Sequence, residues 1–231
     1  MSRLRSVPEG GATAVVSLFR GVYPADRAAA LAGVPRSTLY YWARHEVWTP
    51  TRRATRPKLW TYSDVVAARI IYWLRRDKPE IDSAHTSMPQ VREALAAIRT
   101  HGKEIWDSDL RVLVDREGHV FFKADSEVRR ARKPWTSVEP GALDVLGQFL
   151  WSENRIGPDL VEPRPHLRII PGKLGGEPHV KATRIGTRAV AALLRDGLTA
   201  DKVESLYPDL TQVDIEECRD LEAQLQANLV A

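Results

Sequence analysis

Apolar residues recur at helical spacing over the first eighty residues of the chain. Pro24 stands where a helix begins, Ala25–Leu31 continues it, and Gly33 is placed to end it. A second helix is predicted over Arg36–His45, because its apolar residues recur three and four positions apart. Its inward-facing residues are Leu39, Trp42 and Ala43. Ser63 is the expected cap of a third helix with an apolar stripe of its own, formed by Val66, Ile70, Trp73 and Leu74.

The middle of the chain is less regular. Pro89 opens a predicted helix whose apolar residues lie at helical spacing: Val91, Ala94, Leu95 and Ile98. Leu110–Val114 and His119–Lys123 bracket a turn and predict a β-hairpin. The charged, turn-rich stretch Ser126–Pro140 is the expected linker, whereas the apolar Ala142–Trp151 fits a helix or a strand equally well.

The last third of the chain predicts a short strand at Leu167–Ile170, a Gly- and Pro-rich segment and three helices. The helices are expected over Thr187–Asp196, over Ala200–Tyr207 and after the cap Thr211. One side of the last helix is apolar and consists of Ile215, Cys218, Leu221, Leu225 and Leu229. Three helices with short joints predict a small tri-helical domain.

Charge is distributed unevenly along the chain. Residues 1–80 hold 14 Lys and Arg against 6 Asp and Glu, although the whole chain has a formal net charge of only +4. Residues 164–188 are also basic, whereas residues 189–231 hold nine acidic residues against three basic ones. A basic first third predicts a polyanionic partner, because neutralising phosphates releases counterions. A solvated basic face on an ordinary enzyme is the alternative.

The outward side of the second predicted helix carries residues that suit DNA binding. Arg36, Tyr40 and Arg44 recur four positions apart, with Ser37 and Tyr41 beside them. Arginine can pair with guanine in two places, and Ser and Tyr hydroxyls can bind phosphates. Four more basic residues would flank this helix against the DNA backbone: Arg52, Arg53, Arg56 and Lys58. The pattern predicts a helix-turn-helix that enters the major groove, with a purely structural helix pair as the alternative.

This region resembles a known DNA-binding family. Tyr23–Trp42, followed by Trp60–Asp64, is similar to the MerR-type winged helix-turn-helix. The resemblance implies that the helix from Arg36 and the wing around Arg52–Lys58 contact DNA, and that the protein acts as a homodimer. Pro35 departs from the family pattern, in which a capping Ser is common; proline fits a first turn but supplies no cap hydrogen bond.

A second resemblance covers about the last 65 residues. It is carried by Ile170–Pro178, Ala182–Ile185, Gly197, Tyr207–Leu210 and Asp214–Ile215, which resemble a small bacterial domain of unknown function that recurs in antitoxins. Joined to a MerR-like start, this domain resembles VapB-type antitoxins, which partner a PIN-type ribonuclease toxin. Ala182 stands where the family usually has Gly before Thr-Arg-Ile.

The two resemblances and the patterning together give a mainly α fold with small β elements. We expect a MerR-like winged helix-turn-helix at residues 15–80, a helix plus β-hairpin at 81–125, a linker or irregular segment at 126–163, and a tri-helical antitoxin domain at 164–231. The expected function is that of a type II antitoxin, which represses its own operon by binding promoter DNA and neutralises its toxin by direct binding. The C-terminal part is expected to be free to hold another polypeptide.

The basic segment near residue 180 is the candidate toxin-binding site. The resemblance implies that the PIN-type toxin holds a cluster of acidic metal ligands, with which a basic strand and loop could pair. The candidate residues are Lys173, Lys181, Arg184 and Arg188. The alternative is that Thr183 and Arg184 are internal staples of the domain, because polar residues in such turns often satisfy local backbone groups.

The sequence contains no strong motif for catalysis, metal binding or disulfide formation. The single Cys218 excludes a disulfide framework or Cys-rich zinc site and is expected to pack in the core, and the six histidines show no metal-binding spacing. We expect no enzyme, no cofactor, no metal, no membrane segment and a cytoplasmic location.

Two alternative functions stay open. One is a MerR-like transcription regulator or excisionase-like DNA-binding protein without a toxin partner. The other is a nucleic-acid-processing enzyme with a carboxylate metal site among Asp107, Asp109 and Asp115.

Overall fold

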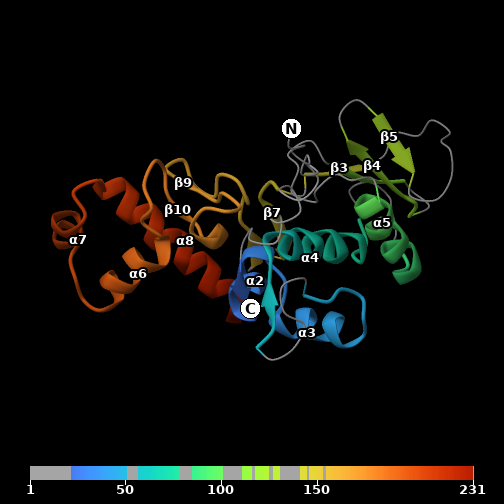
Figure 1. Ribbon diagram of the computed structural model, residues 1–231, viewed down its shortest axis with the longest axis horizontal. Helices are drawn as coiled ribbons and strands as arrows, with labels where there is room; N and C mark the ends of the chain where they lie inside the picture. The colour runs from blue at the N-terminus through green and yellow to red at the C-terminus, as the bar shows by residue number, and fades with distance from the viewer. Residues whose placement is uncertain are drawn as a thin grey trace, which may run out of the picture.

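A computed structural model defines an α-rich chain with small antiparallel strand pairs, as the sequence predicts. It describes residues 22–50, 57–78, 85–100, 111–115, 118–124, 127–130, 141–144, 146–152 and 155–230. In Figure 1 the C-terminal helices lie at one end of the molecule, and the four-stranded sheet with helix α5 lies at the other, with α2 and α4 between them. None of the described helices is long and apolar enough to span a lipid bilayer.

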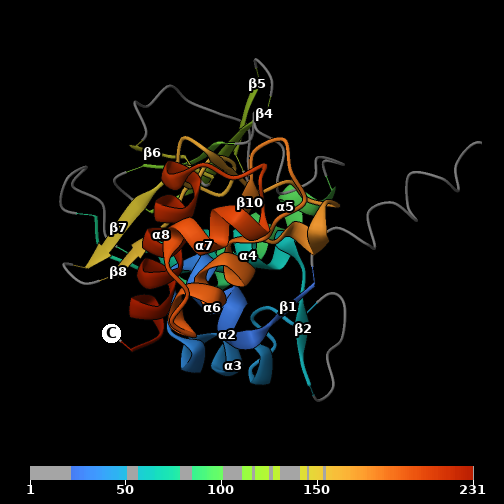
Figure 2. The ribbon, with the colours of Figure 1, turned by 90° about the vertical axis from the view of Figure 1, so that its left-hand side faces the viewer.

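The first two helices form as the sequence predicts. Helix α2 (Ala25–Ala32) ends at Gly33, whose φ of 72° is in the left-handed region that glycine adopts without strain. Helix α3 (Arg36–Arg44) follows after Pro35, which supplies no side-chain cap. The predicted inward side of α3 is buried: Leu39, Trp42 and Ala43. Strand β1 (Tyr23–Pro24) precedes α2 and pairs antiparallel with β2 (Leu59–Trp60), so the chain returns to the start of α2 after α3 (Figure 2).

Helix α4 (Tyr62–Leu74) is capped by Thr61, so the prediction that Ser63 caps it was wrong. The Asp64 amide donates to Thr61 Oγ1 over 3.2 Å, and the Thr61 amide donates to Asp64 Oδ2 over 2.7 Å. This reciprocal capping box requires a carboxylate three positions after the cap, which Thr61 has and Ser63 lacks. Asp64 Oδ1 also accepts a bond of 2.8 Å from Trp48 Nε1, which ties the segment after α3 to the start of α4.

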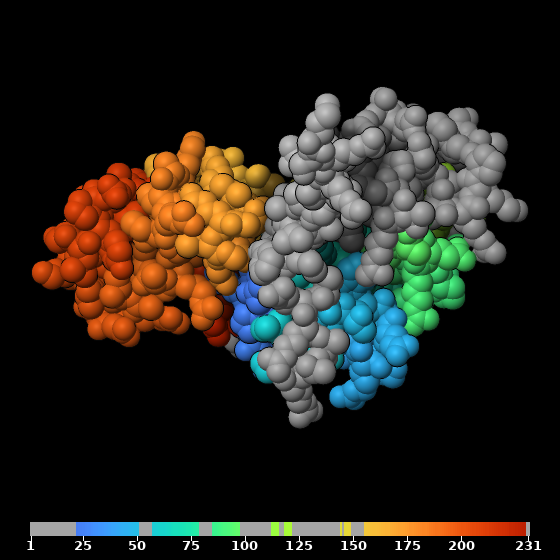
Figure 3. Space-filling view, in the orientation of Figure 1, coloured from blue at the N-terminus to red at the C-terminus, as the bar shows by residue number. Residues whose placement is uncertain are grey.

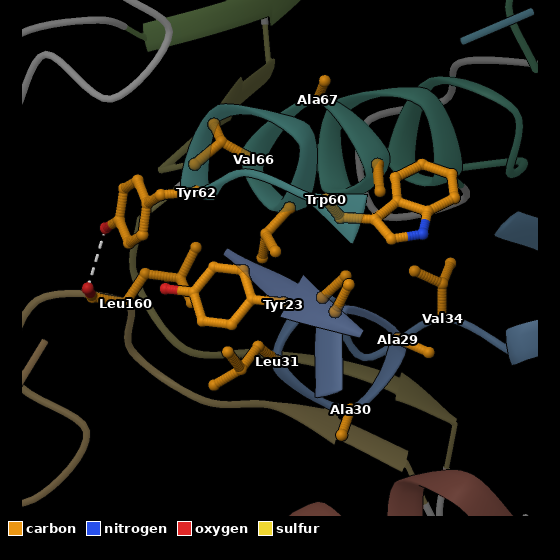
Figure 4. Packing of buried hydrophobic residues seen from close by; sticks show 14 of the residues in the cluster. Tyr23, Ala29, Ala30, Leu31, Val34, Trp60, Tyr62, Val66, Ala67 and Leu160 are labelled. Carbon is orange, nitrogen blue, oxygen red and sulfur yellow. Dashed lines mark hydrogen bonds between the residues drawn. The ribbon is translucent and has the colours of Figure 1, made fainter. Parts of the chain in front are cut away.

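The N-terminal core is formed where α2 crosses α4 (Figure 4). Tyr23, Leu31, Trp60 and Val66 pack there with almost no exposed surface. Leu160, nearly a hundred residues further along the chain, completes this core, and its carbonyl accepts a 2.8 Å hydrogen bond from the Tyr62 hydroxyl. The core of the N-terminal unit therefore includes residues from beyond the middle region.

A buried arginine on α4 links the same parts of the chain. The Arg69 guanidinium is fully buried and donates to the carbonyls of Leu31 (2.7 Å), Gly147 (3.1 Å) and Pro158. Burial lowers the pKa of Arg69 to about 9, so the side chain remains charged at neutral pH. Arg69 thus holds α2 and two segments of the middle region against α4.

The middle region contains the predicted helix and hairpin. Helix α5 spans Met88–Thr100, and its Val91, Ala94 and Leu95 are buried. The predicted hairpin is strands β3 (Arg111–Val114) and β4 (Val120–Ala124), which pair antiparallel. They form the centre of a four-stranded sheet in the order β5-β4-β3-β6.

Four short strands lie within residues 126–163, the segment expected to be a linker or irregular, and two of them overlap the stretch Ala142–Trp151 that fitted a helix or a strand equally well. Strands β5 (Glu127–Arg130) and β6 (Gly141–Leu143) add to the two edges of the sheet. Strands β7 (Phe149–Ser152) and β8 (Arg155–Gly157) pair with each other. The sequence of β5 is mostly charged, so its strand structure depends on pairing with β4 rather than on a local apolar pattern.

The C-terminal unit contains the predicted strand and three helices. Its elements are strands β9 (Leu167–Arg168) and β10 (His179–Val180), the 3₁₀ turn η2 (Leu174–Gly176), and helices α6 (Thr187–Arg195), α7 (Ala200–Leu206) and α8 (Gln212–Val230). Thr211 caps α8 as predicted, since its Oγ1 accepts from the Asp214 amide over 3.2 Å. Four of the five predicted inward residues of α8 are buried, namely Ile215, Cys218, Leu221 and Leu225. The fifth, Leu229, is half-buried.

The C-terminal unit packs directly on the first helix of the N-terminal unit (Figures 1 and 3). Near the end of α8, Asn228 Nδ2 donates to the carbonyl of Ala30 over 3.0 Å, in a buried position. On the other side, the Tyr23 hydroxyl donates to the carbonyl of Gly176 over 2.6 Å. The contact orients the two units relative to each other through α2.

Candidate nucleic-acid interface and partner-binding segment

Helix α3 presents its predicted DNA-binding residues on its solvent side. Arg36, Ser37, Tyr41 and Arg44 are exposed, and Tyr40 is half-buried. They lie together because the opposite side of α3 packs into the core, and Figure 3 shows α3, in light blue, reaching the surface at the lower edge of the molecule. A helix with a buried apolar back and an exposed polar front has the form that the major groove accepts.

Arg36 is oriented by two neighbours. Its Nε lies 2.8 Å from Asp26 Oδ1, and both side chains are more than half exposed. Its guanidinium also lies 5.5 Å from the centre of the Tyr40 ring, a cation–π distance. Hydrogen bonding to Tyr40 and the charge of Asp26 raise the pKa of Arg36. An exposed ion pair contributes little to stability, so the Asp26 contact is weak enough to be exchanged for a phosphate or a base.

The end of α3 is braced from a different helix. The Tyr41 and His45 rings lie 4.2 Å apart, and the His45 carbonyl accepts a 3.1 Å bond from Arg92 on α5. Arg44 has no hydrogen bond or ion pair with any described residue and is exposed. The guanidinium of Arg44 is therefore available to a ligand.

Of the four basic residues of the predicted wing, the structure describes only the last, Lys58. Arg52, Arg53 and Arg56 lie outside the described residues. Lys58 is half-buried and immediately precedes strand β2. Pairing of β2 with β1 places Lys58 near the start of α2, on the same unit as α3.

The four predicted toxin-binding residues lie in the loops of the C-terminal unit and at the start of α6. Lys181, Arg184 and Arg188 are exposed, and Lys173 is half-buried before η2. Lys181 and Arg184 lie in the turn between β10 and α6, and Arg188 is in the first turn of α6.

The neighbouring Thr183 and Arg184 differ in their roles. Thr183 Oγ1 donates to the Val180 carbonyl and accepts from the Ile185 amide, each over 3.0 Å, so Thr183 is an internal staple of this turn. Arg184 makes no hydrogen bond or ion pair with the described part of the chain. Of the two residues that could be internal staples of the domain, Thr183 has this role and Arg184 does not.

The backbone conformation at residue 182 explains why glycine is usual there in the family that this segment resembles. Ala182 has a φ of 62°, in the left-handed region. Residues other than glycine enter this region only at a cost, because their Cβ approaches the carbonyl oxygen. The turn between β10 and α6 thus requires the conformation that glycine adopts freely.

Of the three candidate metal carboxylates, Asp115 alone lies among the described residues. Asp115 is buried, and its carboxylate accepts bonds from the His119 amide (2.7 Å) and lies 2.9 Å from His119 Nδ1. Asp107 and Asp109 lie outside the described residues. Among the described residues, no group of three or more His, Cys, Asp or Glu side chains is arranged to hold a metal ion. Cys218 packs in the core, where burial raises the pKa of its thiol to about 12.

An ionic cluster that no sequence pattern predicts joins the two units. Arg27 on α2 donates from both terminal nitrogens to the two carboxylate oxygens of Glu222 on α8, each over 2.8 Å, and from Nε to Glu177 over 2.8 Å. Thr187 donates to the same Glu222 carboxylate. Burial alone would lower the pKa of Arg27, but its bonds to Glu222 and Glu177 raise it above the ordinary value. The only sequence signal is an arginine within an otherwise alanine-rich helix.

The comparison with protein families gives one match. Residues 168–220 match the family described as "Protein of unknown function (DUF433)". The match begins in β9 and ends within α8, so it covers most of the C-terminal unit. Comparison with curated proteins and comparison with solved structures each give no match.

Proposed function

We propose that this protein is the antitoxin of a type II toxin–antitoxin module. It binds its own promoter through α3 and neutralises a PIN-type ribonuclease through the C-terminal unit. The observation that carries the proposal is the exposed, basic and aromatic front of α3 on a fully buried apolar back. The family match over residues 168–220 is compatible with an antitoxin C-terminal domain.

In the DNA-binding role, a MerR-like homodimer places two copies of α3 in successive major grooves of a palindromic promoter site. Arg36 and Arg44 contact base edges, while Ser37, Tyr40 and Tyr41 hold phosphates. The wing residues Arg52, Arg53, Arg56 and Lys58 add contacts to the DNA backbone. Binding to bacterial promoter DNA places the protein in the cytoplasm.

In the toxin-binding role, the exposed cations of the C-terminal unit pair with the acidic metal ligands of the ribonuclease. Arg184 is the central residue, because it is exposed and has no partner in the described structure. Arg188, Lys181 and Lys173 extend the same basic segment. Charge-assisted bonds from these residues would displace the metal ions that the ribonuclease needs.

The DNA role is tested by titrating labelled promoter duplex with the full-length chain at several salt concentrations. We expect R36A/R44A to bind at least about thirtyfold more weakly, since each base-contacting arginine is worth about 1–3 kcal/mol and the variant removes two of them. The matched control K202A/R219A also removes two exposed charges, but from α7 and α8, and should bind like the wild type. Equal weakening by both pairs, or an affinity insensitive to salt, would contradict the assigned interface.

The toxin role is tested with the ribonuclease encoded beside this chain, using cleavage of a fluorescent RNA as the readout. We expect the wild type to inhibit cleavage, R184E to lose inhibition, and K202E, an equal charge reversal on α7, to retain it. DNA binding without a ribonuclease partner would favour the alternative, a MerR-like or excisionase-like DNA-binding protein. Retained inhibition by R184E would remove Arg184 from the interface.

A further inference from the structure

A groove of about 530 Å³ opens between α2, α6 and α8. Helix α8 contacts both α2 and α6 (Figure 2). The groove's apolar lining comes from all three helices and includes Ala30, Ala191, Leu194, Ala223, Leu225 and Leu229. A volume of this size lies within the range of sites that bind small molecules, about 300–1,000 Å³.

The rim of this groove carries arginines without partners. Arg188 and Arg195 on α6 and Arg219 on α8 line the groove, are exposed, and make no hydrogen bond or ion pair with the described residues. Thr187 at the start of α6 bonds Glu222 in the second half of α8, and α7 connects the other ends, so α6 and α8 run antiparallel. Arg195 and Arg219 therefore both lie on the side of the Thr187–Glu222 bond that leads to α7.

The acidic side chains of the groove are already neutralised. Glu222 is held by Arg27 in a two-bond ion pair, and Asp26 pairs with Arg36 on α3. The uncompensated charge around the apolar lining is therefore positive. Exposed guanidiniums bind carboxylates and phosphates through paired, charge-assisted bonds.

We propose that this groove binds a small amphipathic anion, in which an apolar chain or ring carries a carboxylate, sulfonate or phosphate group. The apolar part lies on the alanines and leucines of the three helices, and the anionic group is held between Arg195 and Arg219. This site adjoins the DNA-binding front of α3 at Asp26, which lines the groove and pairs with Arg36. It shares Arg188 alone with the proposed toxin-binding segment.

Isothermal titration of the full-length chain with decanoate tests the proposal, with two matched probes. Decyltrimethylammonium has the same apolar chain with the opposite charge, and acetate has the same carboxylate without the chain. We expect decanoate to bind with an affinity at least tenfold above either probe. Absence of decanoate binding, or equal binding of the cationic probe, would overturn the proposal.

Variants then locate the site. R195A/R219A should weaken decanoate binding at least tenfold, and A223F should block it, because Ala223 lies on the exposed side of α8 and a larger side chain there fills the groove without entering the core. The matched control R184A/K202A removes two exposed charges outside the groove and should bind decanoate like the wild type. Equal affinity of R195A/R219A and the control would show that the arginines hold no anion. Unimpaired binding by A223F would show that the ligand lies elsewhere.

Discussion

Replacing Arg27 with alanine is expected to destabilise the whole protein, because this side chain joins α2 to the C-terminal unit. Arg27 is 7% exposed, and it donates three hydrogen bonds of 2.8 Å to two carboxylates that are separated from it by 150 and 195 residues. Alanine would leave Glu177 and Glu222 facing each other without a cation. Glu222 would keep only its bond from Thr187 within the described structure.

The expected loss follows from the number of bonds and the exposure of the acceptors. Each hydrogen bond to a charged group contributes about 1.5–3 kcal/mol, and breaking a buried ion pair by removing one partner costs about 3–5 kcal/mol. Glu222 and Glu177 are 16% and 25% exposed, so water would solvate them in part once Arg27 is gone. The low end of the range therefore applies, and we expect Arg27→Ala to lower the free energy of unfolding by about 3 kcal/mol.

Urea unfolding followed by tryptophan fluorescence and circular dichroism measures this change. Arg36→Ala is the matched control, because Arg36 also pairs with an acid at 2.8 Å, but both of its side chains are more than half exposed. We expect no measurable change for Arg36→Ala. A loss below about 1 kcal/mol for Arg27→Ala, or an equal loss for both variants, would show that the buried cluster does not stabilise the junction.

Three further predictions concern the C-terminal unit. Ala182→Gly should raise the free energy of unfolding by about 0.5 kcal/mol, because the φ of 62° at this position favours glycine. Ala223→Gly within α8 should lower the free energy of unfolding by about 1 kcal/mol, because glycine weakens a helix. The urea midpoints of the two variants should therefore shift in opposite directions. His179 is buried, and its pKa is lowered by burial and by Lys173 despite a bond to the Glu177 carbonyl. The unfolded chain therefore binds a proton that the folded chain does not, so the melting temperature should fall as the pH drops below about 6.5. The fall should be smaller in His179→Asn. An equal fall of the melting temperature with pH in both proteins would refute the role of His179. Cys218, with a pKa of about 12, should resist iodoacetamide at pH 8 until denaturant is added, and labelling of the folded chain would contradict its burial.

Elements with a local pattern could be predicted from the sequence. Leu39 and Trp42 on α3, and Ile215 and Leu221 on α8, identify their helices because helical spacing of apolar residues depends on neighbours within two turns. The exposed front of α3 follows from the same spacing, since the residues opposite a buried stripe face the solvent.

Features that depend on distant partners could not be predicted. Arg27 and Glu222 are 195 residues apart, and no periodicity relates them. Strand β5 has a charged sequence and exists through its pairing with β4. The cap of α4 is a different case, because the capping box depends on Thr61 and Asp64 together and a single serine such as Ser63 does not identify it.

Helix α2 connects the two proposed binding surfaces, and this determines how mutational data should be interpreted. Its Asp26 pairs with Arg36 at the front of α3, while its Arg27 and Ala30 contact α8 and the C-terminal loops. A substitution inside α2 would therefore disturb both proposed binding surfaces together through the fold. Loss of DNA binding in Arg27→Ala would consequently be no evidence that Arg27 touches DNA, whereas the same loss in a variant of the exposed Arg44 with an unchanged unfolding midpoint would be direct evidence for a contact.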